Sequence, residues 1–199
     1  RMLRGFKDMS GVFITFEGID GCGKSTQIDI FRRKLEDEGY ETVLLREPGG
    51  TPIGEGIRNI LLDKVNTGMS TQTELLLFEA ARAQIVEELI NPLLKNGKIV
   101  LCDRFTDSST AYQGYGRLLG RDVVEKLNMF AIGKTIPDIT FLFDIEPSVA
   151  LSRMQLRDRE KERMDSERME FMKRVREGYL EIAKTNTGRI KVLNAEKDI

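Results

Sequence analysis

The sequence predicts an α/β fold in which one parallel sheet of five strands is covered by helices on both faces. Two observations carry this prediction. Five short runs rich in β-branched and aromatic residues alternate with longer segments of helical spacing, and such alternation is typical of parallel sheets with crossover helices. In addition, a glycine-rich loop joins the first strand-like run to the first helix.

The strand predictions rest on apolar runs that end at glycine or at charged residues. They cover residues 12–16, 42–45, 99–103, 139–144 and 190–193. Strands that are buried on both faces of a parallel sheet carry continuous apolar runs of this kind.

The helix predictions rest on apolar residues spaced three and four apart. They cover residues 24–38, 52–63, 71–95, 122–133, a segment beginning at Pro147 and a segment ending near Thr185. In the first helix Ile28, Phe31 and Leu35 share one face, and Gly39 is expected to end it. For the third helix, an end near Pro92 is an alternative.

Length and composition indicate one compact domain. The 199 residues are 40% hydrophobic and 32% charged, which suits a globular protein. We expect this domain to span residues 9–199, with Met9 as the natural start and residues 1–8 as a remnant or an upstream extension. A net charge of −1 gives no overall basic field, so we expect no nucleic-acid partner. Nor does any apolar run approach the roughly 20 residues of a membrane helix.

Histidine is absent from the sequence, which excludes Ser-His-Asp and Cys-His catalysis and metal sites built on histidine. The two cysteines, Cys22 and Cys102, are too few for a disulfide framework, so a reduced cytoplasmic compartment is the simpler interpretation. A Mg²⁺ ion held by hydroxyl, carboxylate and phosphate oxygens remains compatible with this composition.

Residues 18–25, GIDGCGKS, match the phosphate-loop pattern G-x-x-x-x-G-K-[ST]. In this motif backbone N–H groups surround phosphate oxygens, Lys24 reaches the β- and γ-phosphates, and the Ser25 hydroxyl binds Mg²⁺. The loop lies between a strand and a helix, whose N-terminus adds partial positive charge. We therefore predict a nucleoside triphosphate site formed by Gly18, Ile19, Asp20, Gly21, Cys22, Gly23, Lys24, Ser25 and Thr26.

Two carboxylates near this loop need separate interpretations. Asp20 lies inside an anion-binding loop, where its charge costs electrostatic energy. It is either a ligand to a sugar hydroxyl or to hydrated Mg²⁺, or a turn residue. Asp103 ends the third predicted strand and is a further candidate metal ligand beside Ser25. Cys22 occupies a variable position and is interpreted as a small filler.

Two classes of phosphate-loop protein compete. A GTPase switch needs an Asn-Lys-x-Asp motif, which the sequence lacks. A kinase of a small acceptor needs a second anion site and mobile basic residues. Arg104 follows the third strand, at the edge of the sheet where ligands bind in such folds, and its guanidinium can form paired hydrogen bonds to a phosphate. The alternative for Arg104 is a surface salt bridge.

Further residues suit recognition of a nucleotide acceptor. Phe78 and Arg82 are four residues apart on one predicted helix, so an aromatic plane lies beside a guanidinium, as a nucleobase site requires. Core packing with a surface arginine is the alternative. Residues 107–114 concentrate hydroxyl, amide and phenol groups close to Arg104, which suits base and sugar recognition.

Residues 153–165 are a candidate lid. The segment carries Arg153, Arg157, Arg159, Lys161 and Arg163 among acidic residues, and the alternative is a solvated helix with ion pairs at i,i+4 spacing. Phosphoryl transfer depends on positioning and charge stabilisation. We therefore predict that basic residues of this segment act in catalysis with Lys24, Arg104 and Asp20.

Four stretches together resemble the thymidylate kinase family. They are FEGIDGCGKSTQ at 16–27, REPGGT at 46–51, ARAQ at 81–84, and DRFTDSSTAYQG at 103–114. They occur in the family's order, and the resemblance runs to about residue 193. It implies a P-loop NTPase fold of the nucleoside monophosphate kinase kind, and phosphoryl transfer from ATP–Mg²⁺ to dTMP that gives dTDP and ADP for dTTP synthesis.

The resemblance also implies roles for residues at the acceptor phosphate. Arg58 and Arg104 would bind the dTMP phosphate, with Glu47 close by. Pro48 would follow a cis peptide bond. Asp20 would contact the 3′-hydroxyl or a water bound to magnesium.

At the base, the resemblance implies that Phe78 stacks on thymine while Arg82, Ser109 and Gln113 hydrogen-bond to its edge. Tyr112 would lie against the sugar and disfavour a 2′-hydroxyl.

The resemblance further implies that Asn194 and Ala195 flank the adenine of ATP. It singles out three lid arginines, Arg153, Arg157 and Arg163, as contacts to phosphate and adenine that act in catalysis. Relatives are homodimers, and the helices from Pro52 and Thr71 are candidates for the shared surface.

Two other functions stay open on the residues alone. The nearer one is a kinase of another small nucleotide such as dUMP, and the other is a nucleotide-binding module that has lost catalysis. Lys24, Ser25 and Arg104 argue against such a loss.

Overall fold

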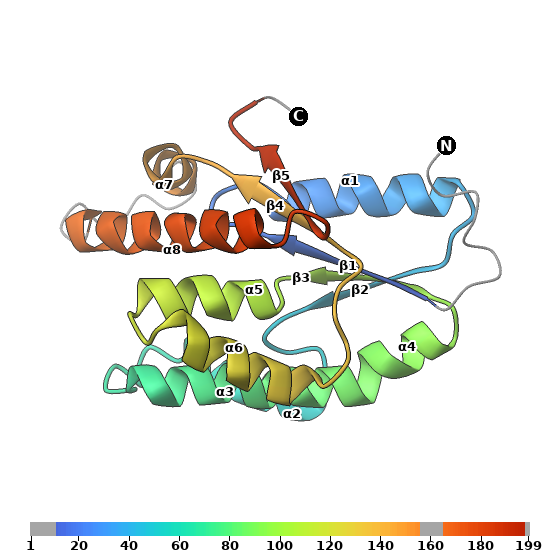
Figure 1. Cartoon of the computed structure of the whole chain (residues 1–199), viewed down its shortest axis with the longest axis horizontal. Coiled ribbons are helices and arrows are strands. Elements are labelled where there is room, and N and C mark those ends of the chain that lie inside the picture. Colours follow the sequence, from blue (N-terminus) through green and yellow to red (C-terminus); the bar gives the residue numbers. More distant parts are fainter. Residues whose placement is uncertain (1–10, 156–164, 198–199) are drawn as a thin grey trace.

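The computed structural model describes residues 11–155 and 165–197. The expected extension at 1–8, the expected start at Met9 and most of the expected lid lie outside these ranges. Five parallel strands form one sheet with helices on either side (Figure 1), so the predicted fold class is confirmed. No helix in the described ranges is long and apolar enough to cross a membrane.

The sheet has the strand order β2-β3-β1-β4-β5. All five predicted strands are present, as β1 (Val12–Glu17), β2 (Thr42–Arg46), β3 (Ile99–Asp103), β4 (Ile139–Asp144) and β5 (Ile190–Asn194). From β1 the chain moves first to the β2–β3 side and later to the β4–β5 side, which makes the carboxyl end of β1 a topological switch point. Ligands bind at such points in open α/β sheets.

Side chains of β1 alternate between the two faces of the sheet, and all of β1 is buried. On one face Phe16 contacts Phe31 of α1 (Lys24–Asp37), with ring centroids 5.9 Å apart. On the other face Phe13 meets the edge of Phe105 at 4.9 Å. Apolar residues from both faces therefore fix β1 in the centre, and the loop that follows β1 starts from a rigid strand.

Helix α1 ends where the sequence predicts. Gly39 has a φ of +83°, a conformation that glycine adopts without steric cost. The N–H of Tyr40 donates to the carbonyl of Leu35 over 3.0 Å, and the N–H of Gly39 donates to that of Glu36 over 2.9 Å. These two bonds satisfy carbonyl groups that the helix end leaves free.

The remaining predicted helices are also present. They are α2 (Pro52–Leu62), α3 (Thr71–Ile85), α6 (Arg121–Ile132), α7 (Pro147–Gln155) and α8 (Asp165–Thr185). After α3 the chain stays helical through the π-helical turn η1 (Val86–Ile90) and α4 (Asn91–Lys95). The alternative end near Pro92 is therefore wrong. Pro92 lies in the first turn of α4, where proline is tolerated.

One helical segment is absent from the sequence predictions. Residues 106–116 form α5 (Thr106–Ser109) and the π-helical η2 (Thr110–Gly116). Serine and threonine hydroxyls compete for backbone groups, which hides a helix from propensity reasoning. Close contact with α8 holds this segment: a Cβ on Gly116 would lie 2.7 Å from the ring of Phe171, and one on Gly178 would lie 2.7 Å from the ring of Tyr115.

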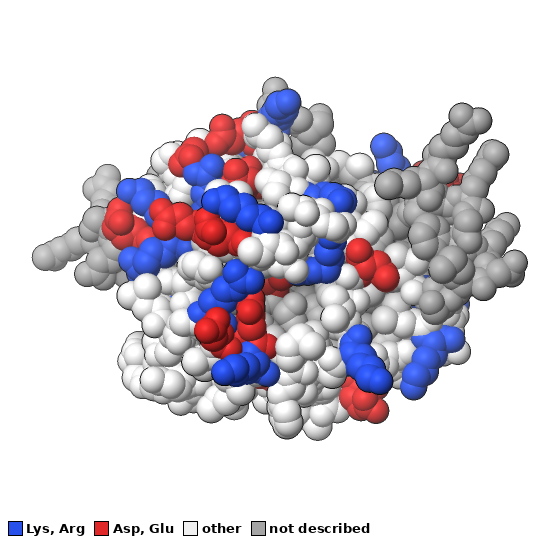
Figure 2. Space-filling model, in the orientation of Figure 1, with Lys and Arg blue, Asp and Glu red and all other residues white. Residues whose placement is uncertain are grey.

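Charges of both signs are intermixed on the face shown in Figure 2, and many of them pair. Arg121 bonds to Glu125 over 2.6 Å along α6, and Arg176 of α8 bonds to Asp144 over 2.7 Å and also contacts Glu146. Such surface pairs add little stability each. By contrast, the side chain of Arg104 is 19% exposed and lines two cavities.

Candidate active site

Two cavities open at the carboxyl edge of the sheet. The larger has a volume of about 710 Å³ and the smaller about 330 Å³, which is the usual range for small-molecule sites. Both are lined by Asp20, Asp103 and Arg104. The cavities therefore share a wall, so ligands bound in them would meet there.

The glycine-rich loop forms the floor of the larger cavity. Gly21 and Gly23 have φ values of +83° and +90°, and a Cβ on Gly21 would lie 2.5 Å from the carbonyl oxygen of Ala150. The N-cap of α1 is Gly23, which among the described residues gives this helix end no side-chain cap. The first N–H groups of α1 therefore remain available to an anion, as is common at helix N-termini that bind phosphate.

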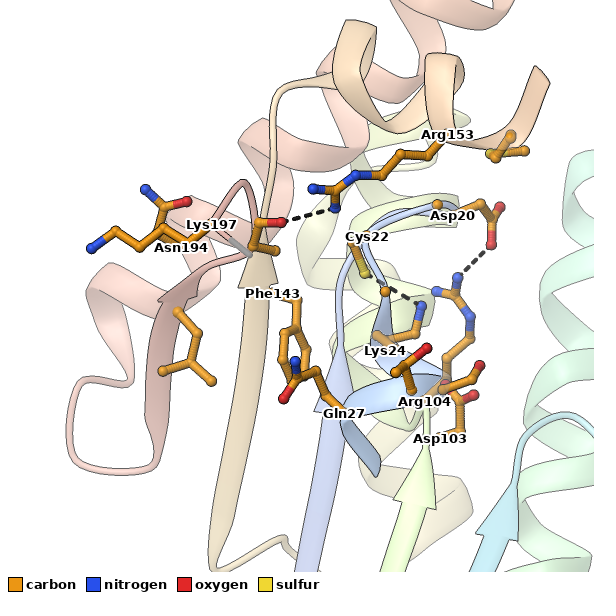
Figure 3. A pocket seen from close by; sticks show the side chains of 17 residues that line it. Asp20, Cys22, Lys24, Gln27, Asp103, Arg104, Phe143, Arg153, Asn194 and Lys197 are labelled. Carbon is orange, nitrogen blue, oxygen red and sulfur yellow. Dashed lines mark hydrogen bonds and ion pairs between the residues drawn. The ribbon is translucent and has the colours of Figure 1, made fainter. Parts of the chain in front are cut away.

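Lys24 points from the start of α1 into this loop (Figure 3). Its Nζ donates to the carbonyl of Gly18 over 3.3 Å and lies 3.8 Å from Cys22 Sγ. Burial and the nearby charge of Arg104 lower the pKa of Lys24. A phosphate in the loop would offer the ammonium a charged partner in place of these weak contacts. Cys22 is buried, as expected of a small filler.

Oxygen ligands suited to Mg²⁺ lie at the entrance of the loop. Ser25 and Asp103 line the larger cavity, and Asp103 Oδ1 is buried without a hydrogen-bond partner among the described residues. Within the described ranges no three His, Cys, Asp or Glu side chains gather into a metal cage. These residues fit Mg²⁺, which binds through few protein oxygens and completes its shell with water and phosphate.

Arg104 stands at the wall between the cavities. Its guanidinium bonds to Asp20 over 2.7 Å, to the Tyr112 hydroxyl over 3.2 Å and to the Tyr179 hydroxyl over 3.3 Å, and it lies 4.9 Å from the centroid of the Tyr112 ring. The salt bridge foreseen as the alternative for Arg104 does exist, with Asp20 as partner. Because it borders both cavities, the same arginine can also bind an incoming anion.

A buried polar cluster lies behind Arg104, and the sequence did not predict it. Glu17 accepts hydrogen bonds from Ser108 Oγ over 2.6 Å, from the Tyr179 hydroxyl over 2.9 Å and from the N–H of Phe105 over 2.7 Å. Burial, and then the nearby charge of Asp107, raise the pKa of Glu17 to about 7. Ser108 and Tyr179 in turn contact the Arg104 guanidinium, so the cluster fixes its position.

Glu17 is a carboxylate at the end of an apolar strand, and this position could have indicated a buried polar site. Tyr179 gives no such signal, because an aromatic residue on a helix is most often core.

The structure brings all residues predicted for the acceptor together around the smaller cavity. Its walls contain Glu47, Pro48, Arg58, Phe78, Arg82, Arg104, Ser109, Tyr112 and Gln113. They come from the loop after β2, from α2 and α3, and from the segment after β3. Arg46 and Leu62 also line this cavity and were not predicted, and Ser108 lines it from the predicted donor-rich segment 107–114.

Arg82 is fully buried rather than a surface arginine, which corrects the alternative considered for it. Its guanidinium bonds to Glu47 over 2.8 Å, to Glu79 over 2.6 Å, to Asn128 over 2.7 Å and to the carbonyl of Phe105 over 3.2 Å. Arg82 therefore joins four separate segments around the cavity. Burial raises the pKa of Glu47 to about 7 against the opposing attraction of Arg82.

The peptide bond between Glu47 and Pro48 is cis, which confirms that prediction. The carbonyl of Pro48 accepts hydrogen bonds from Arg58 over 2.9 Å and from Arg46 over 3.0 Å. Thr51 caps α2 by accepting from the N–H of Gly54 over 3.0 Å. This loop thereby holds two guanidinium groups at the outer rim of the smaller cavity.

At the other end of the larger cavity, Arg153 of α7 donates to the carbonyl of Ala195 over 2.9 Å (Figure 3). Asn194 and Ala195 line this end, so Arg153 lies beside the two residues predicted to flank adenine. Arg157 and Arg163 lie outside the described residues. Of the three predicted lid arginines, only Arg153 is therefore among the described residues.

The fold and the two adjoining cavities, one on a phosphate loop and one on arginines, define a P-loop kinase of the nucleoside monophosphate class. A family model described as Thymidylate kinase matches residues 16–199. The chain belongs to the thymidylate kinase family, which confirms the resemblance found in the sequence.

Relatives and a solved structure agree with this assignment. The thymidylate kinase of Bacillus velezensis is 50% identical over 190 residues, covering 95% of this chain and 90% of the relative. That of Kosmotoga olearia is 50% identical over 188 residues, covering 94% and 89%. The crystal structure of thymidylate kinase from Ehrlichia chaffeensis superposes with a TM-score of 0.77 at 39% identity, covering 93% of this chain and 91% of that one.

Proposed function

We propose that the chain transfers the γ-phosphoryl group of ATP to dTMP, giving ADP and dTDP, with ATP in the larger cavity and dTMP in the smaller. One observation carries this division of the site. Arg104 lies in the wall that the two cavities share, where the phosphate of an acceptor would face the phosphate loop. Neither the GTPase nor the inactive module gains support from any feature of the site.

ATP binding is assigned to the glycine-rich loop and to the far end of the larger cavity. The N–H groups at the start of α1 and the Lys24 ammonium bind the β- and γ-phosphates. Ser25 and Asp103 hold Mg²⁺, directly or through water. The adenine lies near Asn194 and Ala195, where Arg153 is already bonded to the carbonyl of Ala195.

dTMP binding is assigned to the smaller cavity. Arg58 and Arg104 bind its phosphate, and Arg104 exchanges part of its contact with Asp20 for this ligand. Asp20 is then free to accept a hydrogen bond from the sugar hydroxyl or from a water on magnesium.

At the base, Phe78 stacks on thymine and Gln113 meets its polar edge. Ser109 and Arg82 complete the polar wall, and Tyr112 lies against the sugar.

Catalysis in this arrangement rests on position and charge. Phosphoryl transfer spreads negative charge over the equatorial oxygens of the moving group. Lys24 and Arg104 border the place where that charge develops, and their cations stabilise it in a site from which bound substrates exclude water. Mg²⁺, when bound, neutralises the phosphates and orients them. Arg157 and Arg163 are proposed to add further positive charge on closure.

The proposed enzyme is cytoplasmic and homodimeric. Both cysteines are free thiols, which suits a reducing compartment. Large apolar side chains are exposed on α2, α3 and α6, and they are Ile53, Ile60, Leu62, Leu76, Val123, Met129 and Phe130. Exposed apolar side chains on three helices favour self-association. Light scattering after size exclusion should give twice the chain mass, and a monomer would contradict it.

The activity itself is tested by coupled release of ADP from ATP–Mg²⁺ with a panel of monophosphates. We expect turnover of dTMP to exceed that of dUMP, dCMP and AMP. A preference for AMP would contradict the proposed acceptor. Omission of Mg²⁺, with EDTA added, should stop turnover.

A further inference from the structure

Gln113 forms part of the smaller cavity and is held from behind by a residue outside it. The side chain of Gln113 is 4% exposed and lines the cavity. Its Nε2 donates a hydrogen bond of 2.8 Å to Oε1 of Glu74, in the first turn of α3. Among the described residues, Glu74 is not one of those that line the cavity. Any influence of Glu74 on a ligand therefore acts through Gln113.

The carboxylate of Glu74 is itself fixed by an arginine. Arg117 donates from Nη2 to Oε2 over 3.0 Å and from Nε to Oε1 over 3.2 Å. Its guanidinium lies 4.9 Å from the centroid of the Phe171 ring. A two-point contact of this kind sets the plane of the carboxylate as well as its position. Glu74 thus presents an oriented acceptor to Gln113.

A carboxylate decides which way a neighbouring amide is turned. An ionised carboxylate can accept hydrogen bonds but has none to donate, whereas the two ends of an amide are a donor and an acceptor. If the Gln113 amide were turned around, its oxygen would face an oxygen of Glu74 at hydrogen-bond distance. Nε2 therefore stays on the Glu74 side. Among the described residues none donates to Oε1 of Gln113, so this acceptor remains available to a ligand.

We propose that Glu74 is a positioning residue that determines base specificity, because it fixes the Gln113 amide with its acceptor toward the base. This inference rests on the proposed contact between Gln113 and thymine. Thymine carries a donor, N3–H, between two carbonyl acceptors, whereas cytosine carries an unprotonated N3 acceptor beside an amino donor. A fixed amide oxygen pairs with the first and opposes the second. Unpaired polar groups of this kind reduce use of the wrong base by about ten- to hundredfold.

The fixed orientation is what makes the contact selective. An amide that can turn over offers its oxygen to thymine in one orientation and its nitrogen to cytosine in the other. It then accepts both bases. The specificity lies in the contact between Gln113 and Glu74, and not in the glutamine alone.

The test compares dTMP, dCMP and dUMP as acceptors for Glu74→Gln. A neutral amide at position 74 can pair with either end of the Gln113 amide. The Gln113 amide is then no longer held in one orientation. We expect the ratio of kcat/KM for dTMP to that for dCMP to fall about tenfold, and KM for dTMP to rise while kcat changes less than about twofold. The ratio of dTMP to dUMP should stay unchanged, because both bases carry N3–H. A general loss of folded enzyme would lower kcat/KM for all three acceptors alike and would leave both ratios unchanged.

Two further variants separate a failure of the proposed role of Glu74 from a failure of the contact between Gln113 and the base. Glu125→Gln breaks a comparable Arg–Glu pair on α6 and should leave every ratio unchanged. Gln113→Leu should lower the dTMP to dCMP ratio by itself, and adding Glu74→Gln to it should have no further effect. If Gln113→Leu lowers the ratio and Glu74→Gln does not, the role of Glu74 is overturned while the base contact stands. If Gln113→Leu leaves the ratio unchanged, the base contact fails and the inference fails with it.

Discussion

The backbone of Arg104 has a positive φ of 73°, a conformation that costs a non-glycine residue about 1–2 kcal/mol. Its own N–H compensates in part by donating to the carbonyl of Phe16 over 3.0 Å. The conformation turns the side chain from the end of β3 toward Asp20, Tyr112 and Tyr179. Backbone strain at a residue that two cavities share is common at functional sites. It supports Arg104 as the residue around which the site is built.

Tyr179→Phe tests whether the buried cluster positions Arg104. The variant keeps the ring but removes the hydroxyl that contacts both Arg104 and Glu17. We expect kcat/KM for dTMP to fall about ten- to a hundredfold, the equivalent of one lost hydrogen bond to a charged group, and KM for ATP to change little. Tyr115→Phe is the control, since Tyr115 contacts α8 but lines neither of the two described cavities. Equal values for wild type and Tyr179→Phe would contradict the positioning role.

At the scale of elements, the site depends on the contact between η2 and α8. This contact brings Tyr179 on α8 to the polar cluster and places Tyr112 of η2 beside it, with the two rings 6.2 Å apart. Gly116 and Gly178 allow the two helical segments to approach closely. The donor-rich segment found in the sequence is therefore held as a helix by α8, and the Ser108–Tyr179 hydrogen bond between them joins residues 71 positions apart in the chain.

Two glycine substitutions measure this approach. A Cβ on Gly178 would lie 2.7–2.9 Å from three atoms of Tyr115, so Gly178→Ala should lower the free energy of unfolding by about 1–3 kcal/mol. Gly56 on α2 has no atom within 4 Å of the added Cβ. Gly56→Ala should therefore stabilise the chain by about 0.5–1 kcal/mol. Urea unfolding gives both values, and a stabilising Gly178→Ala would show that the helices can separate freely.

At the scale of the whole molecule, the sequence could predict what depends on local pattern. The phosphate loop and Arg104 belong to short motifs next to strands, and β1 and β3 lie side by side, with Phe16 opposite Asp103. Adjacent strands therefore bring those motifs together. Glu74, Asn128 and Tyr179 were not predicted, because their roles come from contacts between distant segments that leave no periodic signal.

The buried carboxyls make the free energy of unfolding depend on pH, and the sign of this dependence follows from their pKa shifts. Burial raises the pKa of Glu17 and of Glu47 from 4.5 to about 7. Each group binds its proton more tightly in the folded chain than in the unfolded chain. Its contribution to the free energy of unfolding is therefore fully present below about pH 4.5 and is lost as the pH rises through about 7. The loss is of the order of 3 kcal/mol per carboxyl at most. No histidine is present to titrate in this window.

Urea unfolding at about pH 5.5 and about pH 8 checks this sign. We expect the wild type to be more stable at the lower pH, and Glu17→Gln to lose less stability between the two, because the neutral amide does not titrate. A wild type that gains stability toward about pH 8 would show that these carboxyls are ionised throughout the window.

Arg104 is proposed to bind the acceptor phosphate at the wall between the cavities, and the division of the site into an ATP side and a dTMP side depends on this contact. The most direct measurement is kcat/KM for dTMP at saturating ATP–Mg²⁺ in Arg104→Ala. Arg32→Ala serves as control, because Arg32 lies exposed on α1 and pairs with Glu36. The predicted result is a fall of about a hundredfold or more in kcat/KM for dTMP, with the affinity for ATP nearly unchanged and the control equal to wild type. An unchanged kcat/KM for dTMP in Arg104→Ala would contradict the account.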